Sequence, residues 1–356
     1  MIPYGRQSID DDDIAAVTAV LKGDWLTQGP HVEEFEEALA ARVGAAHAVV
    51  FANGTAALHG AAAAAGLGPA DVVATSPLSF VASANCARFV GASVTFVDID
   101  PETLNLDVAA VPAGVDGLVA VHYAGLPVDL SRLGARPRVV IEDACHALGA
   151  VTPDGPVGNC ARSDLCVFSF HPVKHITTGE GGAVTTNNAG LAHALRRFRS
   201  HGTVAKPEHG GWYYEVESLG YNYRLTDIQA ALGTSQLGRL DRFVSGRQAL
   251  AARYRTLLAD LPVVLPPGPA PGFTHAYHLF PIRVRDRRRV YEAMRDAGIA
   301  VQVHYVPIHH HPIYAEAAAM CPNADAAYER LLSLPLFPDL TEPEQDRVVE
   351  TLAELL

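Results

Sequence analysis

Six short apolar runs, rich in β-branched residues, alternate with helical patterns between residue 45 and about residue 186. The runs lie at 47–52, 71–75, 93–98, 117–122, 138–143 and 165–170. Helical patterns at 55–65 and 80–90 end near Gly66 and Gly91, and glycine suits a helix C-terminus. Because the runs are apolar on both faces, the pattern predicts an α/β fold whose mainly parallel sheet is covered by helices on both sides.

The pattern changes after Arg224. Long amphipathic helices are predicted at 225–242 and 245–260, and the Pro- and Gly-rich segment 265–273 follows them. Beyond it we predict a strand at 276–284, a helix at 286–297, a strand at 299–305, and helices near 323–333 and 341–355. We therefore expect an N-terminal segment and large domain over 1–224, and connecting helices with a smaller C-terminal α/β domain over 225–356.

Composition and charge narrow the class of protein. With 356 residues, 49% of them hydrophobic, the chain can bury a substantial core and is not a small binding module. A net charge of −12 disfavours nonspecific binding to nucleic acid or anionic lipid. The five cysteines lack the spacing of a metal site, and no apolar run is long enough to span a membrane. These features predict a soluble cytoplasmic protein that binds neither nucleic acid nor membrane.

Lysine is rare in this chain, since only three of its 27 basic residues are lysines. Lys22 ends a predicted helix and Lys206 lies in a polar segment, so both are expected at the surface. Lys174 instead follows an apolar strand and precedes a Gly-rich turn in FSFHPVKHITTGEGGAV. Arginine cannot replace a lysine that must react as a free amine, because a guanidinium keeps its proton near neutral pH. An isolated loop lysine is usually a surface residue, so the residues around Lys174 decide its role.

Asp143 ends the predicted buried strand 138–143, at the edge of an α/β sheet where ligand sites gather. A pyridine ring acts as an electron sink only while its nitrogen is protonated, and a carboxylate beside the nitrogen keeps it so. Three residues later, His146 could hydrogen-bond a phenolic oxygen of the ring or orient Asp143. The alternative for His146 is a hydrogen-bonded histidine beneath the sheet.

A phosphate site is predicted where a strand turns through Asn53, Gly54 and Thr55 into a helix. Backbone N–H groups at such a helix N-terminus bind phosphate, and glycine permits close approach. Ser169, five residues before Lys174, could add a hydroxyl. Phe80 starts a helix just past a strand end, where an aromatic ring stacks on a cofactor or packs in the core.

Six motifs, in this order, carry a family resemblance: NGTAAL, SFVASAN, EDACHALG, SFHPVKHITTGEGG, FRSHG and GYNYRLTDIQAALG. They resemble the DegT/DnrJ/EryC1/StrS sugar aminotransferases over nearly the whole chain. The resemblance implies a fold-type I aminotransferase that uses pyridoxal 5′-phosphate (PLP) and forms a homodimer with active sites shared between subunits.

The resemblance also implies a role for each candidate residue. Lys174 would form the Schiff base with PLP, and Asp143 would pair with the pyridine nitrogen. His146 would lie by the ring oxygen, and Phe80 would stack on the ring. Gly54, Thr55 and Ser169 would hold the phosphate, while Asn222 would reach the partner subunit's phosphate. The alternative for Asn222 is a turn or cap before the helix that begins near Leu225.

Within the family, the segments IPYGRQSI, DWLTQGP, VHYAGLPVDL, KHITTGEGG and VQVHYVPIHHHPIY resemble one subgroup. Its members make UDP-4-amino-4,6-dideoxy-N-acetyl-β-L-altrosamine for pseudaminic acid. This implies amino transfer from glutamate to C4 of a UDP-linked 4-keto-6-deoxy-N-acetylhexosamine. The sugar-nucleotide pocket would be lined by Tyr4, Asp24, Trp25, Leu26, Thr27, His304, Tyr305, Val306 and Pro307.

The sequence leaves three alternative functions open. The first is an aminotransferase for another nucleotide-linked 3- or 4-keto sugar. The second is a PLP-dependent sugar dehydratase, although the dehydratases of the family carry histidine in place of the lysine. The third is a non-catalytic regulator on the same fold, which would not need Lys174, Asp143 and a phosphate site together.

The run His309–His311 raises the question of a metal site. Consecutive side chains diverge along a regular backbone, and no carboxylate or thiol stands at ligand spacing in the sequence. We therefore predict no metal.

Overall fold

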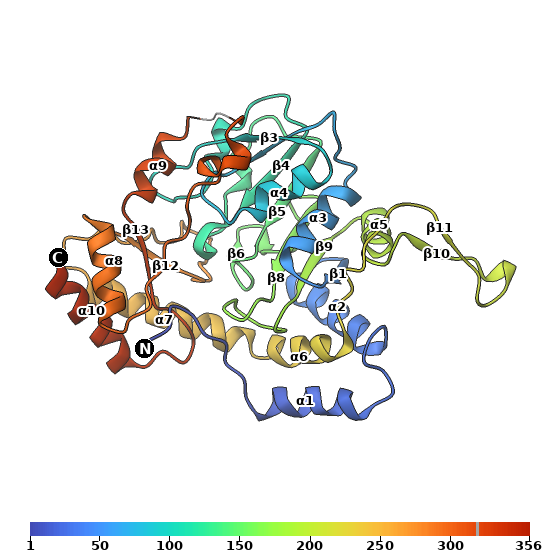
Figure 1. Ribbon diagram of the computed structural model, residues 1–356, viewed down its shortest axis with the longest axis horizontal. Helices are drawn as coiled ribbons and strands as arrows, with labels where there is room; N and C mark the ends of the chain where they lie inside the picture. Colours follow the sequence, from blue (N-terminus) through green and yellow to red (C-terminus); the bar gives the residue numbers. More distant parts are fainter. Residues whose placement is uncertain (318–319) are drawn as a thin grey trace.

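A seven-stranded sheet forms the centre of the computed structural model, which describes residues 1–317 and 320–356 (Figure 1). Across the sheet the strands are β1 (His47–Phe51), β9 (Gly182–Thr186), β8 (Leu165–Ser169), β5 (Val139–Asp143), β4 (Gly117–Val121), β2 (Val72–Thr75) and β3 (Ser93–Phe96). Neighbours from β8 to β3 are parallel. The mainly parallel sheet is thus confirmed, and the six predicted strands are present with ends within two residues.

β9 is the strand that the sequence pattern did not reveal. It runs antiparallel to both neighbours, with Gly182 opposite Phe51 of β1 and Ser169 of β8. Its first residues belong to the Gly-rich stretch after Lys174, which resembles a turn in the sequence. Because β9 returns directly beside β8, the loop 170–181 needs no crossover helix and stays at the edge where the parallel strands end.

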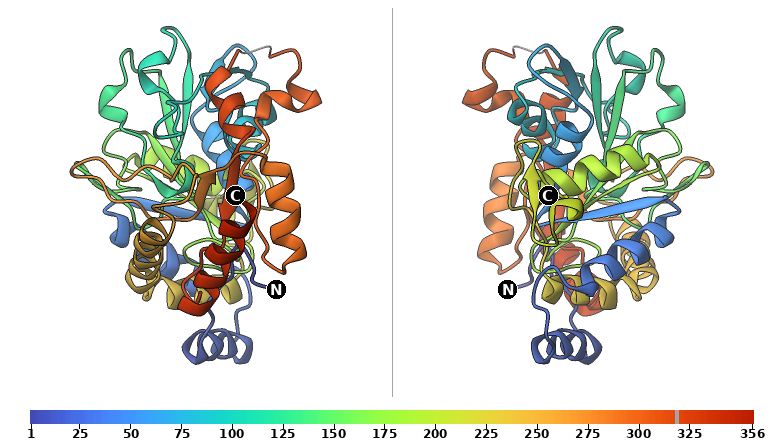
Figure 2. Two further views of the ribbon diagram at one scale, coloured as in Figure 1. Left: turned by 90° about the vertical axis from the view of Figure 1, so that its left-hand side faces the viewer. Right: turned by 90° about the vertical axis from the view of Figure 1, so that its right-hand side faces the viewer.

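Helices cover both faces of the sheet (Figures 1 and 2). Val49 and Val167 face one side, which packs against α3 (Gly54–Ala64), α4 (Ala82–Phe89) and α5 (Ala189–Arg199). Val50 and Phe168 face the other, which packs against α2 (Pro30–Val43) and α6 (Asp227–Leu237). α1 (Asp11–Lys22) lies outside, against α6. Alternate residues of each strand therefore enter different cores, as expected for strands that are apolar on both faces.

Several element bounds beyond residue 224 differ from the prediction. α7 (Leu240–Leu257) starts just after Gly238, so the two long helices meet there and not near residue 244. The strand predicted at 276–284 shortens to β12 (Phe280–Arg283). The strand predicted at 299–305 is wrong, since this segment forms only isolated bridges from Ile299 to Ile2 and from Gln302 to Ser333.

The helix predicted near 323–333 also ends early. α9 covers Pro322–Tyr328, and β13 (Leu331–Leu334) then pairs antiparallel with β12. The Leu-rich run suits a buried helix or a buried strand, but Pro335 cannot continue a helix and β12 offers its backbone a partner. α8 (Arg287–Asp296) and α10 (Glu342–Leu355) agree with the predicted helices.

A second hydrophobic cluster joins β12, β13, α8, α10 and the second half of α7, and Ile2 from the N-terminus enters it. α7 itself spans both cores: Phe243 packs under the sheet, while Tyr254 packs in the second cluster. The division of the chain at residue 224 therefore stays a prediction, because α7 is shared.

A hairpin of β10 (Thr203–Ala205) and β11 (Tyr214–Val216) projects from the body beside α5 (Figure 1). Its tip and its return segment carry apolar side chains into solvent: Trp212 is 83% exposed and Leu219 is 91% exposed. A shorter hairpin, β6 (Val151–Thr152) with β7 (Gly155–Pro156), lies after β5. Large apolar side chains on a projecting arm indicate a contact surface.

Across the described residues, no helix combines the length and the apolar character needed to cross a membrane. All five cysteines are unpaired, and Cys145 is the one of them that is not fully buried.

Candidate functional site

A cavity of about 530 Å³ lies at the edge of the sheet where the parallel strands end. Three strands deliver their last residue to it: Val121 from β4, Asp143 from β5 and Ser169 from β8. This is the edge at which open α/β sheets bind ligands. Predicted residues in its wall are Tyr4, Gly54, Thr55, Phe80, Asp143, His146, Ser169, Lys174, His304 and Tyr305.

Lys174 enters the cavity from the loop between β8 and β9. Its backbone N–H donates to the carbonyl of His171 at 2.9 Å, which forms a tight turn. The Nζ atom lies 3.4 Å from Nε2 of His278. Burial lowers the pKa of Lys174 from its ordinary value of 10.5, so the amine releases its proton more readily than an ordinary lysine side chain does.

Asp143 is held from two sides. The Ser83 hydroxyl donates to Oδ2 at 2.6 Å, and the backbone N–H of Cys145 donates to Oδ1 at 3.2 Å. Ser83 in turn contacts the Ser79 hydroxyl at 2.7 Å. Neither serine was predicted from the sequence: Ser79 lies in the turn before α4 and Ser83 in the first turn of that helix, and both line the cavity.

His146 belongs to a cluster of rings beside Lys174. The Tyr305 hydroxyl lies 3.1 Å from Nε2 of His146, and the His278 ring lies 4.3 Å from the His146 ring between centroids. Burial lowers the pKa of both histidines well below the ordinary value of 6.5. Both imidazoles are therefore neutral and able to accept a hydrogen bond. His278 was not predicted as a site residue, because it lies inside the segment 276–284 that was expected to form a strand.

The N-terminus of α3 has the geometry that suits the predicted phosphate site. Asn53 caps the helix by accepting from the Ala56 N–H at 2.8 Å, while the first helical N–H groups have no partner within the helix. A Cβ on Gly54 would stand 2.9 Å from the Ser169 Cβ, so only glycine lets the Ser169 hydroxyl lie against this end. The backbone N–H groups and hydroxyl suit an anionic phosphate.

Phe80 is 55% exposed at the cavity wall, with its ring centroid 6.1 Å from that of Tyr305. The core-packing alternative is therefore wrong, and the face of the ring is free to contact a planar group.

Seven predicted residues lie outside the cavity of the single chain: Asn222, Asp24, Trp25, Leu26, Thr27, Val306 and Pro307. Asn222 and the segment Asp24–Thr27 are exposed, and Trp25 retains 58% of its surface. Asn222 does not cap the next helix, since Thr226 is the N-cap of α6. Val306 is exposed and Pro307 is buried, both just beyond the two residues of that segment that do line the cavity. Their predicted roles stay predictions.

Consecutive side chains at His309–His311 were expected to diverge and therefore to bind no metal. The expected divergence is wrong, because two of these side chains converge. Nε2 of His309 and of His310 lie 3.0 and 2.8 Å from Oδ1 of Asp325 on α9. Ligand atoms around tetrahedral zinc stand farther apart, about 3.3 Å for bonds of about 2 Å. Nδ1 of His309 is also buried without a partner in the described part of the chain, whereas metal-bound histidines usually donate that N–H. The geometry suits hydrogen bonds to the carboxylate.

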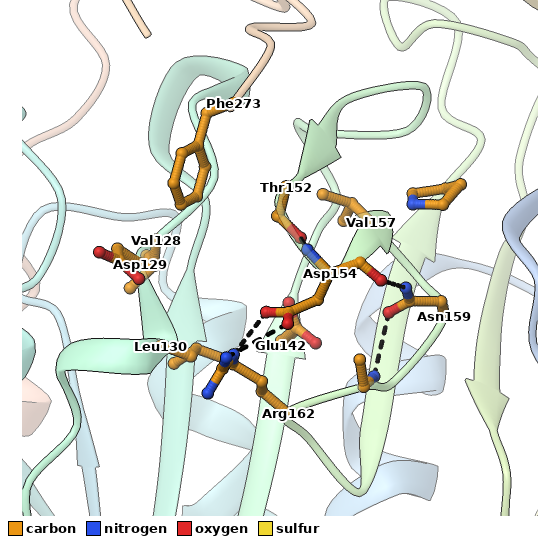
Figure 3. A pocket seen from close by; sticks show the side chains of 12 residues that line it. Val128, Asp129, Leu130, Glu142, Thr152, Asp154, Val157, Asn159, Arg162 and Phe273 are labelled. Carbon is orange, nitrogen blue, oxygen red and sulfur yellow. Dashed lines mark hydrogen bonds and ion pairs between the residues drawn. The ribbon is translucent and has the colours of Figure 1, made fainter. Parts of the chain in front are cut away.

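A second, much smaller cavity of about 20 Å³ lies beside Glu142 (Figure 3). A void of this size holds about one water and no substrate. Glu142 accepts from the Ser163 hydroxyl at 2.5 Å and from Nε2 of His122 at 2.8 Å. The Val128 N–H donates to Nδ1 of His122, so the proton of this imidazole is on Nε2. The network is buried and lies on the face of β5 opposite Asp143.

A mainly parallel sheet, with a lysine, a carboxylate and a phosphate-binding helix end at the edge where its strands end, defines the class of fold-type I PLP enzymes. The residues fit the cofactor in this structure: glycine at 54 lets the Ser169 hydroxyl lie against the N-terminus of α3, and this end of the helix lines the same cavity as Asp143 and Lys174.

Residues 7–353 match the DegT/DnrJ/EryC1/StrS aminotransferase family, and the chain belongs to it. SpsC, a spore coat polysaccharide biosynthesis protein of Bacillus subtilis, is 37% identical, with 100% of this chain and 97% of that protein covered. PseC of Helicobacter pylori, an aminotransferase involved in pseudoaminic acid biosynthesis, is 31% identical with a TM-score of 0.91 and full coverage of both chains. The protein is therefore a sugar aminotransferase.

A further solved structure supports the cofactor. Spr1654 of Streptococcus pneumoniae in its PMP form is 27% identical, with a TM-score of 0.93 over 100% of this chain and 99% of that one, and a PLP form is also known. The enzyme depends on PLP.

Proposed function

We propose that the enzyme transfers the amino group of glutamate to C4 of a UDP-linked 4-keto-6-deoxy-N-acetylhexosamine, giving UDP-4-amino-4,6-dideoxy-N-acetyl-β-L-altrosamine. The observation that carries the proposal is the meeting of Lys174 and Asp143 in one cavity with Tyr4, His304 and Tyr305, residues of the segments that resemble the altrosamine subgroup. The full-length likeness to PseC of Helicobacter pylori supports the same substrate class.

When bound, PLP supplies an electron sink for the bond-breaking steps. Asp143 would face its ring nitrogen and keep that nitrogen protonated, and Ser83 and Cys145 fix the orientation of the carboxylate. Burial lowers the pKa of the Lys174 amine, which would take a proton from the donor's carbon and return one to the sugar carbon. His146, neutral and held by Tyr305, would lie by the ring oxygen.

The proposed enzyme works as a cytoplasmic homodimer. Apolar side chains of the projecting hairpin, among them Trp212 and Leu219, are exposed in the single chain and suit contact with a second copy. Asn222 follows the hairpin and is exposed as well, so it is free to reach the phosphate in the partner's cavity. The exposed segment Asp24–Thr27 would line the sugar pocket at the same interface.

One incubation tests the substrate proposal. The PLP-loaded enzyme, glutamate and a panel of nucleotide-linked 3- and 4-keto sugars are mixed, and products are identified by mass spectrometry and NMR. We expect 2-oxoglutarate and the 4-amino sugar from the UDP-linked 4-keto N-acetylhexosamine. Amination of a different panel member would replace the proposed substrate. Release of a dehydrated sugar without amination would support the dehydratase alternative instead.

A second test concerns Lys174. Borohydride reduction of the PLP-loaded enzyme should attach a pyridoxyl group to Lys174, and Lys174→Arg should abolish turnover because the guanidinium remains protonated. Peptide mass mapping locates the label, with Lys22 and Lys206 as the other lysines of the chain. A label on either of those two would contradict the assignment.

A further inference from the structure

Arg247 on α7 is fully buried, with 0% of its surface exposed. In the described part of the chain its hydrogen-bond partners are all backbone carbonyl oxygens, and no carboxylate pairs with it. Burial lowers the pKa of Arg247 from 12.5 to about 10. Burial of a cation without a counter-ion costs free energy. The role of this arginine is therefore to be found in the segments that its guanidinium connects.

The guanidinium joins three separate segments. Nη2 donates to the carbonyl of Val173 at 3.3 Å, one residue before Lys174. Nη1 is shared among the carbonyls of Tyr277 at 3.4 Å, His278 at 3.3 Å and Leu336 at 2.9 Å. Arg247 therefore ties the loop that carries Lys174 to the segment that carries His278.

The segment that carries His278 needs such support. Tyr277 has a φ of 49°, in the left-handed region that a bulky residue adopts only under constraint from its surroundings. Arg247 contacts the carbonyl of this residue and of the next one. With the chain turned in this way, Nε2 of His278 lies 3.4 Å from Nζ of Lys174 inside the cavity.

We propose that Arg247 is a positioning residue that holds the Lys174 amine against the His278 imidazole, an inference that rests on the proposed role of Lys174. The neutral imidazole accepts a hydrogen bond from the amine and orients it. The buried charge of Arg247 also disfavours a second positive charge on Lys174, so it adds to the effect of burial in lowering the pKa of the amine. Geometry and charge thus act on the same nitrogen.

The scarcity of lysine makes the test direct. The cofactor-free protein is trace-acetylated with acetic anhydride at a series of pH values. Mass spectrometry then compares the acetylation of Lys174 with that of exposed Lys22 in one sample. In Arg247→Met we expect the acetylation of Lys174 relative to Lys22 to fall at a fixed pH, because loss of the buried positive charge leaves a larger share of Lys174 protonated. In the loaded enzyme, kcat should fall while KM for the sugar nucleotide stays near its wild-type value.

Two further variants separate the causes. Arg247→Lys keeps the charge but loses the planar fork, so Lys174 should acetylate nearly as in the wild type while kcat still falls. Arg253→Met removes another arginine of α7, one that pairs with Asp346 away from the cavity, and should change neither quantity.

A folded Arg247→Met protein with wild-type acetylation ratio and wild-type kcat would overturn the inference. If that variant does not fold, Arg247→Lys decides, and wild-type kcat in it would overturn the inference as well. Failure of the proposed function is seen separately, as the absence of a pyridoxyl label on Lys174 in the wild type. The acetylation measurement on the cofactor-free protein is unaffected by that result.

Discussion

Asp143 owes its orientation to two donors, the Ser83 hydroxyl and the Cys145 backbone N–H, one on each carboxylate oxygen. Both donors leave the remaining lone pairs free to face the cavity. Asp143 therefore provides a negative charge that is fixed at the last position of β5, where the ring nitrogen of the cofactor is expected.

Asp143→Asn should lower kcat by orders of magnitude with little change in Tm. The amide keeps the shape and one acceptor for Ser83, but it carries no charge to keep the ring nitrogen protonated. Turnover and thermal unfolding are measured on the same preparation. Asp164→Asn is a matched control, because Asp164 accepts from the Val140 N–H near the opposite end of β5. Near wild-type turnover in Asp143→Asn would contradict the role.

The sequence predicted that Lys174 and Asp143 belong to one site, because the chemistry of a PLP enzyme admits few residue types at these positions, and both line one cavity. It was not sufficient for Ser83 or His278. A serine and a histidine have many uses, and these two act through partners 60 and 104 residues away in the chain. Only the folded chain shows which partner each one meets.

At the scale of the element, β5 holds two buried carboxylates on opposite faces. Asp143 points into the large cavity, while Glu142 joins the network with His122 and Ser163. Burial alone would raise the pKa of Glu142, but hydrogen bonds from His122 and Ser163 outweigh it and hold that pKa below the ordinary 4.5. The network therefore stabilises the fold while the carboxylate is ionised.

Glu142→Gln should lower the free energy of unfolding by about 2 kcal/mol near neutral pH, the usual value of a hydrogen bond to a charged group. The folded pKa is depressed, so the wild-type advantage is full above pH 4.5 and is lost as pH falls through the lower folded value. Urea unfolding of both proteins at a series of pH values measures this difference. Exposed Glu350→Gln is the control. A difference that stays constant down to acid pH would disprove the explanation.

An element of the fold could be predicted from the sequence when its own residues strongly favour one secondary structure. The strands of the parallel sheet are apolar on both faces and were found. β9 was missed because Gly181 and Gly182 resemble a turn. This segment becomes a strand by pairing with β1 and β8. β13 was predicted as part of a helix, because the sequence of Leu331–Leu334 suits a helix or a strand. Pairing with β12 decides for the strand.

At the scale of the whole molecule, the shared-site prediction is open to a complementation test. Inactive Lys174→Arg chains are mixed with weakened Asn222→Ala chains and allowed to exchange subunits. If Asn222 serves the partner's cavity, one site of each mixed dimer has both native residues and regains full activity. If Asn222 acts within its own chain, activity stays at the Asn222→Ala level. Size-exclusion chromatography of the separate variants checks that each still dimerises.

The cavity also has a consequence for how the enzyme is made. Its wall includes Tyr4, whose carbonyl accepts from the Leu336 N–H at 3.0 Å, while the Ile2 N–H donates to Gly298 at 2.8 Å. A ribosome releases the first of these residues long before the last is synthesised, so the N-terminal segment has no place to bind during most of translation. The side of the cavity that Tyr4 forms can therefore close only after Leu336 has emerged. The cavity wall is completed late in synthesis, by two segments that lie more than 300 residues apart in the chain.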